Sequence, residues 1–190
     1  MIITPGPGVL SAAGMGSAYG FRSGLRYLVG LFFGTNLVGF AVITGLAAII
    51  LGIPAVRNVL LVASMGYLLY LAYRIAFAGS RVAFIEAKAP PGIPSGVLLQ
   101  IINPKAYAVN TTLYMGFAFY PASFAFEMTA KVLIMNAIWI PIHLAWLYAG
   151  SALHRLNLSD RAQSRINILM GLSMLGVVTL AFLSTLGANP

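Results

Sequence analysis

Apolar residues along the chain fall into six blocks, and turn-forming and charged residues gather in the five short breaks between them. The blocks span residues 2–19, 27–51, 59–77, 95–120, 128–149 and 166–186. A helix that crosses a membrane needs about 20 mostly apolar residues. The pattern therefore predicts six transmembrane helices, of which the first is the weakest candidate.

The composition agrees with a chain that faces lipid. Of its 190 residues, 60% are hydrophobic and only 7% are charged, and its mean hydropathy is +0.93. Soluble domains are about one quarter charged. The net charge of +8 comes from single basic residues between apolar blocks and forms no patch, which argues against nucleic-acid binding. We expect one all-α integral membrane domain over residues 1–190, with the lipid bilayer as its surroundings.

Basic residues are shared unevenly between the breaks, and this predicts an orientation. The first, third and fifth breaks, with their helix ends, carry Arg22, Arg26, Arg74, Arg81, Lys88, Arg155, Arg161 and Arg165. The second and fourth carry only Arg57 and Lys131. Because basic residues in short loops stay cytoplasmic, we expect the odd breaks inside and both termini outside.

The third break contains Pro90-Pro91-Gly92-Ile93-Pro94 and is the natural hinge of the chain. It separates a first repeat, residues 1–79, from a second, residues 95–190, with the loop 80–94 between them. Each repeat holds three predicted helices, and this odd number inverts the second repeat in the membrane. Each also begins with a helix that proline interrupts.

These interruptions are Thr4-Pro5-Gly6-Pro7 and Asn103-Pro104-Lys105. At about 1.5 Å per residue, both fall near the middle of a hydrocarbon core about 30 Å thick. Inverted repeats with broken helices that meet at this depth are typical of secondary transporters, in which half-helix N-termini point at anionic substrate groups. The residues of both interruptions are therefore candidates for substrate contact.

Lys105 is the most informative residue, because no carboxylate shares its apolar block. An ionisable side chain in a membrane segment is costly and marks a functional site by default. We favour a cation that receives a carboxylate or gates by charge over a lysine that caps carbonyls of a broken helix. For residues 4–7, an unwound segment lining a cavity and a frayed helix start both remain open.

His143, which follows Pro141 in the fifth block, is the one side chain at membrane depth that titrates in the neutral range. It could carry a coupling proton, although a lone histidine on a helix is more often a packing group. Trp139 and Trp146 flank it and could stack on a substrate ammonium group, with plain packing the commoner role.

Glycines recur at four-residue spacing, which allows helices to approach closely. The positions are Gly16, Gly20, Gly24, Gly30 and Gly34. Gly20 and Gly24 fall in the predicted first break, so the other spacings bear on packing within the membrane. They indicate packing within one chain first and assembly of a homo-oligomer second.

Three other functions compete with amino-acid transport, two of them outside transport and one, metal-cation export, within it. An intramembrane serine hydrolase would use Ser173 with His143 as its base, but no acid at membrane depth could orient that histidine. An assembly subunit would need no buried ionisable group, and Lys105 argues against it. A metal-cation exporter would need clustered oxygen, thiolate or imidazole ligands. The chain has no cysteine and no clear membrane carboxylate, so we expect no metal, no cofactor and no enzymatic activity.

Several short motifs, in this order and spacing, resemble the LysE-type amino-acid exporters, which include homoserine and threonine efflux proteins. They are Thr4-Pro5-Gly6-Pro7-Gly8, Gly20-Phe21-Arg22-Ser23-Gly24, Gly66-Tyr67-Leu68-Leu69-Tyr70-Leu71, Asn103-Pro104-Lys105, and Ile166-Asn167 with Gly171. The resemblance implies export of amino acids or similar small zwitterions through the bacterial inner membrane, driven by the proton-motive force. Both termini would then be periplasmic.

The chain departs from the family pattern at two places. Similar proteins usually carry a longer apolar stretch before the Thr-Pro-Gly-Pro element, where this chain has only Met1 to Ile3. We therefore expect either an earlier start or a first helix that barely spans. Family members also tend to show Pro-Gln-Phe where this chain has Tyr120-Pro121-Ala122-Ser123-Phe124, which weakens assignment of a substrate by analogy.

The orientation can be tested directly, because the chain has no native cysteine. Single cysteines at Ser80 and Ser159 should be shielded from membrane-impermeant thiol reagents in intact cells, whereas one at Asn58 should react. Labelling of Ser80 and Ser159 without Asn58 would reverse the predicted topology.

Overall fold

The computed structural model describes residues 6–77, 89–156 and 159–186, and the described chain is helical with no strand. Its helices are α1 (Pro7–Ile43), α2 (Leu46–Leu51), α3 (Pro54–Ala76), α4 (Ile93–Ile102), α5 (Pro104–Met115), α6 (Phe124–Arg155) and α7 (Asp160–Leu186). This confirms the all-α fold class.

Helix α1 consists of two arms joined at Gly20. Gly20 has φ 75° and ψ 174°, a backbone conformation that is essentially restricted to glycine. The arms, residues 7–19 and 21–43, fold back on each other, and the Tyr27 hydroxyl donates a hydrogen bond to Ser11 Oγ at 3.0 Å. The predicted first break, residues 20–26, was therefore too long, because the chain resumes its helix directly after Gly20.

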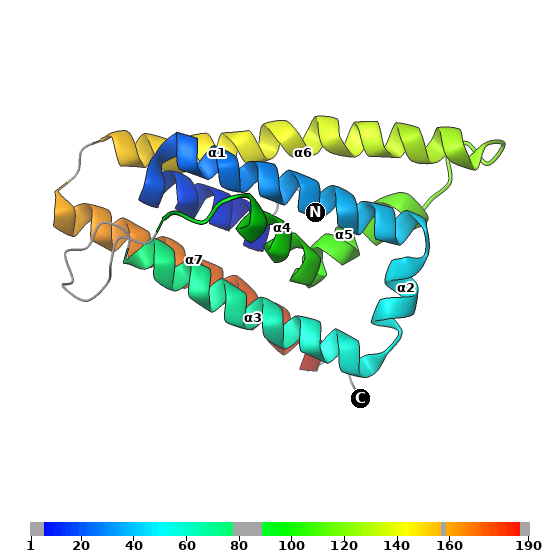
Figure 1. Cartoon of the computed structure of the whole chain (residues 1–190), viewed down its shortest axis with the longest axis horizontal. Helices are drawn as coiled ribbons and strands as arrows, with labels where there is room; N and C mark the ends of the chain where they lie inside the picture. The colour runs from blue at the N-terminus through cyan, green and yellow to red at the C-terminus, as the bar shows by residue number, and fades with distance from the viewer. Residues whose placement is uncertain (1–5, 78–88, 157–158, 187–190) are drawn as a thin grey trace.

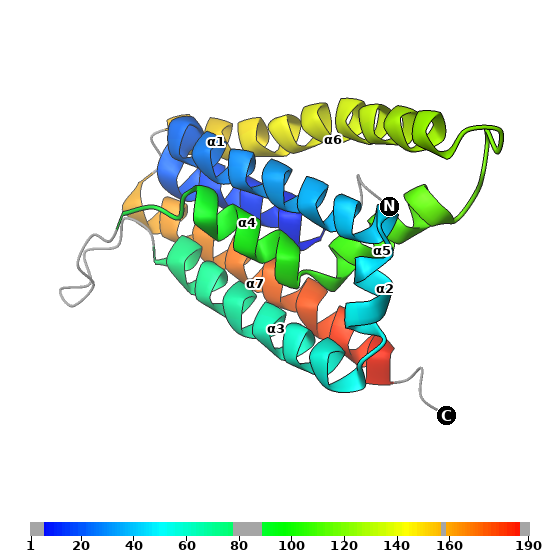
Figure 2. The same cartoon turned by 45° about the vertical axis from the view of Figure 1, so that its right-hand side comes forward.

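The helices form two groups that Figures 1 and 2 show from two sides. In one group, α1 packs along α6 and against α4, while α3 and α7 lie side by side in the other. The helices cross closely at glycines, which have no side chain to keep the backbones apart. A Cβ at Gly30 would overlap the backbone of Ile93, and one at Gly150 would overlap Ala13. The glycine spacing thus serves packing within the chain.

The reversal at Gly20, the end of α3, the end of α6 and the start of α7 lie at one end of the molecule, at the left in Figure 1. Helix α2 and the connection from α5 to α6 lie at the opposite end. The described helix ends thus fall into two sets at opposite ends of the molecule. Which end faces the cytoplasm stays a prediction.

The structure moves several predicted boundaries. Helix α1 ends at Ile43, before Gly45 with φ 77°, so the second predicted block also contains the short α2. Helix α3 begins at Pro54, which places Arg57 and Asn58 in its first turns rather than in a loop. Proline is favoured at the first helical position, because an N–H there would have no partner within the helix.

Helices α4 and α5 divide the fourth predicted block at Asn103, and α6 is longer than the fifth, with Pro141 inside it. Within the described residues, α1, α3 and α6 (over Phe124–Leu153) are long and apolar enough to cross a membrane. The arrangement of six spans in two inverted repeats, with the hinge at 80–94, stays a prediction. Residues 80–88 of that hinge lie outside the described residues.

The outer surface carries many large apolar side chains. Phe40 is 65% exposed, Ile49 is 70% exposed and Leu133 is 66% exposed. In water such a surface would be an aggregation or interaction site, but it matches the hydrocarbon of a bilayer. The buried centre holds Tyr27, Leu31, Leu99 and Leu147.

Replacing Gly20 with Ala should destabilise the reversal of α1, because a Cβ strains the backbone at this φ and ψ. We expect a loss of about 1–3 kcal/mol, seen as a lower unfolding temperature of the purified protein in detergent. Gly66→Ala is the matched control, since nothing lies within 4 Å of the Cβ it would add. An equal unfolding temperature for both variants would show that Gly20 is not the required reversal point.

Candidate functional site

Proline and asparagine together end α4 and start α5 in the interior. Pro104 lacks an N–H and disfavours a helical conformation at the residue before it, and Asn103 is extended with ψ 108°. The Asn103 side-chain oxygen accepts a hydrogen bond from the Lys105 N–H at 3.1 Å, which caps the new helix. Since α4 has ten residues, the break lies about 15 Å from its start.

The first arm of α1 also starts in the interior. Its N-cap is Gly6, with extended φ of −167°, and Pro7 is its first helical residue. The arm runs for 13 residues to Gly20, or about 20 Å. The first N–H groups of any helix lack partners within it and carry partial positive charge. Two such helix ends, at Gly6 and Asn103, line one cavity.

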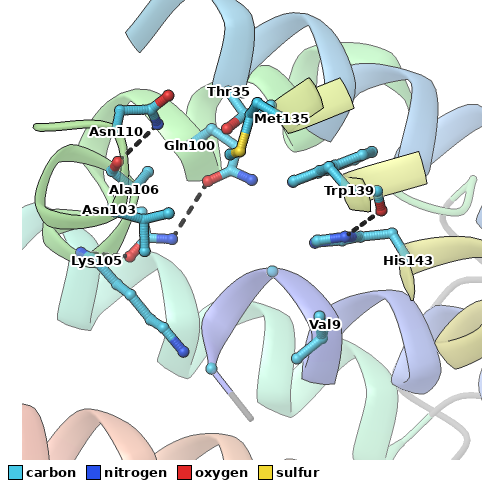
Figure 3. Close-up of a pocket in the computed structure, with 13 residues that line it drawn as sticks. Val9, Thr35, Gln100, Asn103, Lys105, Ala106, Asn110, Met135, Trp139 and His143 are labelled. Carbon is cyan, nitrogen blue, oxygen red and sulfur yellow. Dashed lines mark hydrogen bonds between the residues drawn. The ribbon is translucent and has the colours of Figure 1, made fainter. Parts of the chain in front are cut away.

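This cavity, shown in Figure 3, has a volume of about 50 Å³, which is space for a few water molecules. Three segments surround it together with Thr35 from the second arm of α1. From the start of α1 come Gly6, Gly8 and Val9; from α4 and α5 come Gln100, Asn103, Lys105, Ala106, Val109 and Asn110; from α6 come Met135, Trp139 and His143.

The Lys105 side chain lies across the start of α1. A Cβ at Gly6 would be 2.7 Å from Lys105 Nζ and 2.9 Å from its Cδ, so glycine leaves the space that the lysine occupies. The ammonium group thus adjoins the N-terminus of α1, where a positive charge is unfavourable. No carboxylate is among the described residues that line the cavity. The lining residues that the structure describes therefore carry a positive charge, which an anionic group would complement.

Buried amides form the wall beside Lys105. Gln100, Asn103 and Asn110 are each 4% exposed or less. Asn103 Nδ2 donates to Gln100 Oε1 at 3.3 Å, and Asn110 Nδ2 donates to the Ala106 carbonyl at 2.7 Å. These bonds hold the interrupted helix pair in a fixed shape around the cavity.

His143 closes the opposite wall. Its Nδ1 lies 2.9 Å from the Trp139 carbonyl oxygen, and its ring stacks on the Trp139 indole at a centroid distance of 3.7 Å and an interplanar angle of 15°. Figure 3 shows the ring directed into the cavity. Its Nε2 is 3.4 Å from the position that a Cβ on Gly8 would take.

The structure thus brings together predicted site residues from both repeats, namely Gly6, Pro7, Asn103, Pro104, Lys105 and His143. Pro7 and Pro104 contribute as first residues of their helices. Thr4 and Pro5 lie outside the described residues. Their roles in substrate contact, and the proton-coupling role of His143, stay predictions.

Sequence reasoning missed Gln100, Asn110 and Thr35, although the first two are amides inside an apolar block. The criterion that selected Lys105, a polar side chain at membrane depth, also fits them. Of the two tryptophans, Trp139 lines the cavity and Trp146 does not. Ser173 is exposed and donates to the Leu169 carbonyl, while His143 is buried, so these two residues do not form a hydrolase pair.

Lys131 and Glu127 correct two predictions. Lys131 was counted as a loop charge, and Glu127 was placed in the fourth break, leaving no clear membrane carboxylate. Both lie in α6, with exposures of 2% and 5%, and they form an ion pair at 2.7 Å. Lys131 Nζ donates to the Tyr114 carbonyl at 3.0 Å. It therefore caps the end of α5 and contributes nothing to the charge asymmetry of the loops.

No group of three or more histidine or carboxylate side chains that could hold a metal ion occurs in the part of the chain that the structure describes. The cavity instead presents an ammonium group, amides, a hydroxyl and an imidazole.

A family model for LysE type translocators matches residues 1–185. The chain belongs to this family. The resemblance seen in the motifs is thereby confirmed, as is the prediction that the protein is not an enzyme, since the family consists of translocators. Family and apolar helices together indicate a bacterial inner-membrane protein.

Characterised relatives of this LysE family member are distant. The leucine efflux protein of Klebsiella pneumoniae is 27% identical over 122 residues, which cover 62% of this chain and 58% of that protein. The cysteine/O-acetylserine efflux protein of Salmonella typhi is 29% identical over 155 residues, or 80% and 78% of the two chains. Its counterpart in Escherichia coli K12 is 27% identical over 156 residues, or 81% and 78%. No solved structure matches significantly.

Replacing Lys131 with Met should destabilise the LysE family protein by leaving the buried Tyr114 carbonyl without a donor, which costs about 1–3 kcal/mol. It also leaves Glu127 without its partner. The measurement is the unfolding temperature in detergent, with Thr129→Ala on the exposed face of α6 as control. If Lys131→Met unfolds like the control, the lysine does not hold α5 to α6.

Proposed function

We propose that this protein is a secondary transporter that exports amino acids or similar small zwitterions from the bacterial cytoplasm. The observation that supports this most strongly is that Lys105 and the starts of α1 and α5 line one cavity. The family and the printed functions of the relatives, efflux of leucine and of cysteine or O-acetylserine, support the same conclusion.

In this proposal Lys105 receives the carboxylate of the substrate. A carboxylate placed there balances the lysine charge and also accepts hydrogen bonds from helix N–H groups, as helix N-termini in other sites do with anions. Asn103 and Pro104 act by setting the start of α5, and Gly6 and Pro7 by setting that of α1. The charge-assisted hydrogen bond to Lys105 is the strongest single contact of the site.

The broken helices also explain how the site could open to either side. A half-helix that ends at the cavity can move without carrying its other half, and secondary transporters rock such elements around a fixed midplane site. We propose that the proton-motive force drives this cycle, as the family resemblance implies. His143, the imidazole in the cavity, is our candidate for carrying the coupling proton.

Replacing Lys105 with Ala should abolish efflux while the protein still inserts, because the substrate carboxylate loses its cation. A lost hydrogen bond to a charged group costs about 1.5–3 kcal/mol, so we expect roughly 10- to 150-fold weaker binding. Lys105→Arg should retain part of the activity. Lys105→Glu should be worse than Lys105→Ala, because it repels the carboxylate.

The measurement is amino-acid efflux from cells or vesicles that contain equal amounts of each variant, judged by immunoblot. Arg22→Ala, which removes an exposed basic residue outside the cavity, is the matched control and should transport normally. Unchanged efflux by Lys105→Ala would reduce this lysine to a structural role and remove the main reason for placing the site here.

A further inference from the structure

The hydrogen bond between His143 and Trp139 fixes which nitrogen of the imidazole faces the cavity as an acceptor. A backbone carbonyl can only accept, so Nδ1, which lies 2.9 Å from the Trp139 oxygen, must carry hydrogen. In the neutral ring, Nε2 then holds the lone pair. His143 is only 4% exposed, and Nε2 receives no hydrogen bond from the described residues.

The space in front of Nε2 is held open by Gly8. A Cβ on Gly8 would lie 3.4 Å from His143 Nε2 and 3.5 Å from Gln100 Nε2. These are ordinary contact distances, so an added methyl group would fit, but it would fill the place where a hydrogen-bonding ligand must approach. The imidazole thus presents a buried acceptor to a small open volume.

Gly6 and Gly8, two residues apart at the start of α1, relate the position of this acceptor to that of Lys105. Lys105 Nζ adjoins Gly6, and His143 Nε2 adjoins Gly8. Gly6 and Gly8 are two residues apart, a span of at most about 7 Å, so the cation and the acceptor adjoin the same short backbone segment at the start of α1. A carboxylate and an α-ammonium group joined through one carbon match such a pair of partners.

We propose that His143 accepts a hydrogen bond from the α-ammonium group of the substrate through Nε2, and so selects zwitterions over simple carboxylates. This inference rests on the proposed function, in which Lys105 takes the carboxylate. His143 is then a specificity-determining residue, and the Trp139 carbonyl and ring position it.

The remaining lining restricts the substrate side chain. Val9, Val109 and Met135 are apolar, and the amides of Asn103 and Asn110 donate to groups of the protein itself. With Lys105 as the charged group among the described lining residues, a basic side chain would meet a like charge and no carboxylate. The substrate class is therefore amino acids with a free α-amino group and without a basic side chain.

The test uses purified full-length protein in liposomes. Counterflow of radiolabelled L-leucine, or of whichever neutral amino acid a panel of the twenty shows to be moved best, is competed with three unlabelled compounds. These are the same amino acid, its analogue without the amino group, and L-lysine. Wild-type protein should be inhibited by the first at least tenfold more strongly than by the other two.

Three variants separate the roles of His143. His143→Leu should weaken inhibition by the amino acid about 10- to 150-fold and leave the weak inhibition by the analogue unchanged. His143→Gln, whose amide oxygen can accept the ammonium group, should stay within about tenfold of wild type. Gly8→Ala should resemble His143→Leu, while Gly66→Ala, with open space around it, should behave as wild type.

The outcomes are distinguishable. If wild-type protein moves none of the twenty amino acids and none of the similar small zwitterions tried beside them, the proposed function fails and the inference fails with it. If wild-type protein moves amino acids but His143→Leu keeps full discrimination against the analogue, the inference alone is overturned. Loss of accumulation driven by a pH gradient in His143→Gln, with affinity kept, would add a coupling role to the binding role. Strong inhibition by L-lysine would overturn the exclusion of basic side chains.

Discussion

Unsatisfied backbone groups inside a membrane are the constraint on which this structure depends. In lipid, each N–H and C=O must find a partner within the protein, so a helix can start at membrane depth only where it lines a cavity or is buried by protein. Helix α5 and the first arm of α1 both start in the interior, and each does so with proline at its first position. The positive ends of these two helices and Lys105 line one cavity in an otherwise apolar protein.

Two lysines show how burial and partners decide what a charge does. Lys131 is paired with Glu127 and donates to the carbonyl of Tyr114, so it acts as a structural cap. Lys105 instead extends over Gly6 at the start of α1 and lines the cavity. One lysine of this pair therefore has a structural role in the described residues, and the role of the other in substrate contact stays a prediction.

Close packing around glycine explains how polar segments come together at this depth. Gly30 of α1 lies against the start of α4, and Gly150 of α6 lies against the first arm of α1. A second tie joins α1 and α6 through Asn36 and Asn136, whose amides exchange hydrogen bonds at 3.1 Å and 2.9 Å. Such contacts fix the three segments that surround the cavity, which is why its lining comes from positions far apart in the chain.

The sequence by itself determined the all-α class and the interruption at Asn103 and Pro104, and it selected Lys105 as the main candidate for substrate contact, because hydropathy, proline and an isolated charge act locally. It also indicated the family, through short motifs that each consist of residues close together in the chain. Only the tertiary structure decided that Lys131 is buried with Glu127, that Gly20 alone reverses α1, and that His143 faces Gly8. Those facts depend on which helices pack together, and a side chain's role as loop charge, cap or ligand follows from neighbours that the linear pattern does not contain.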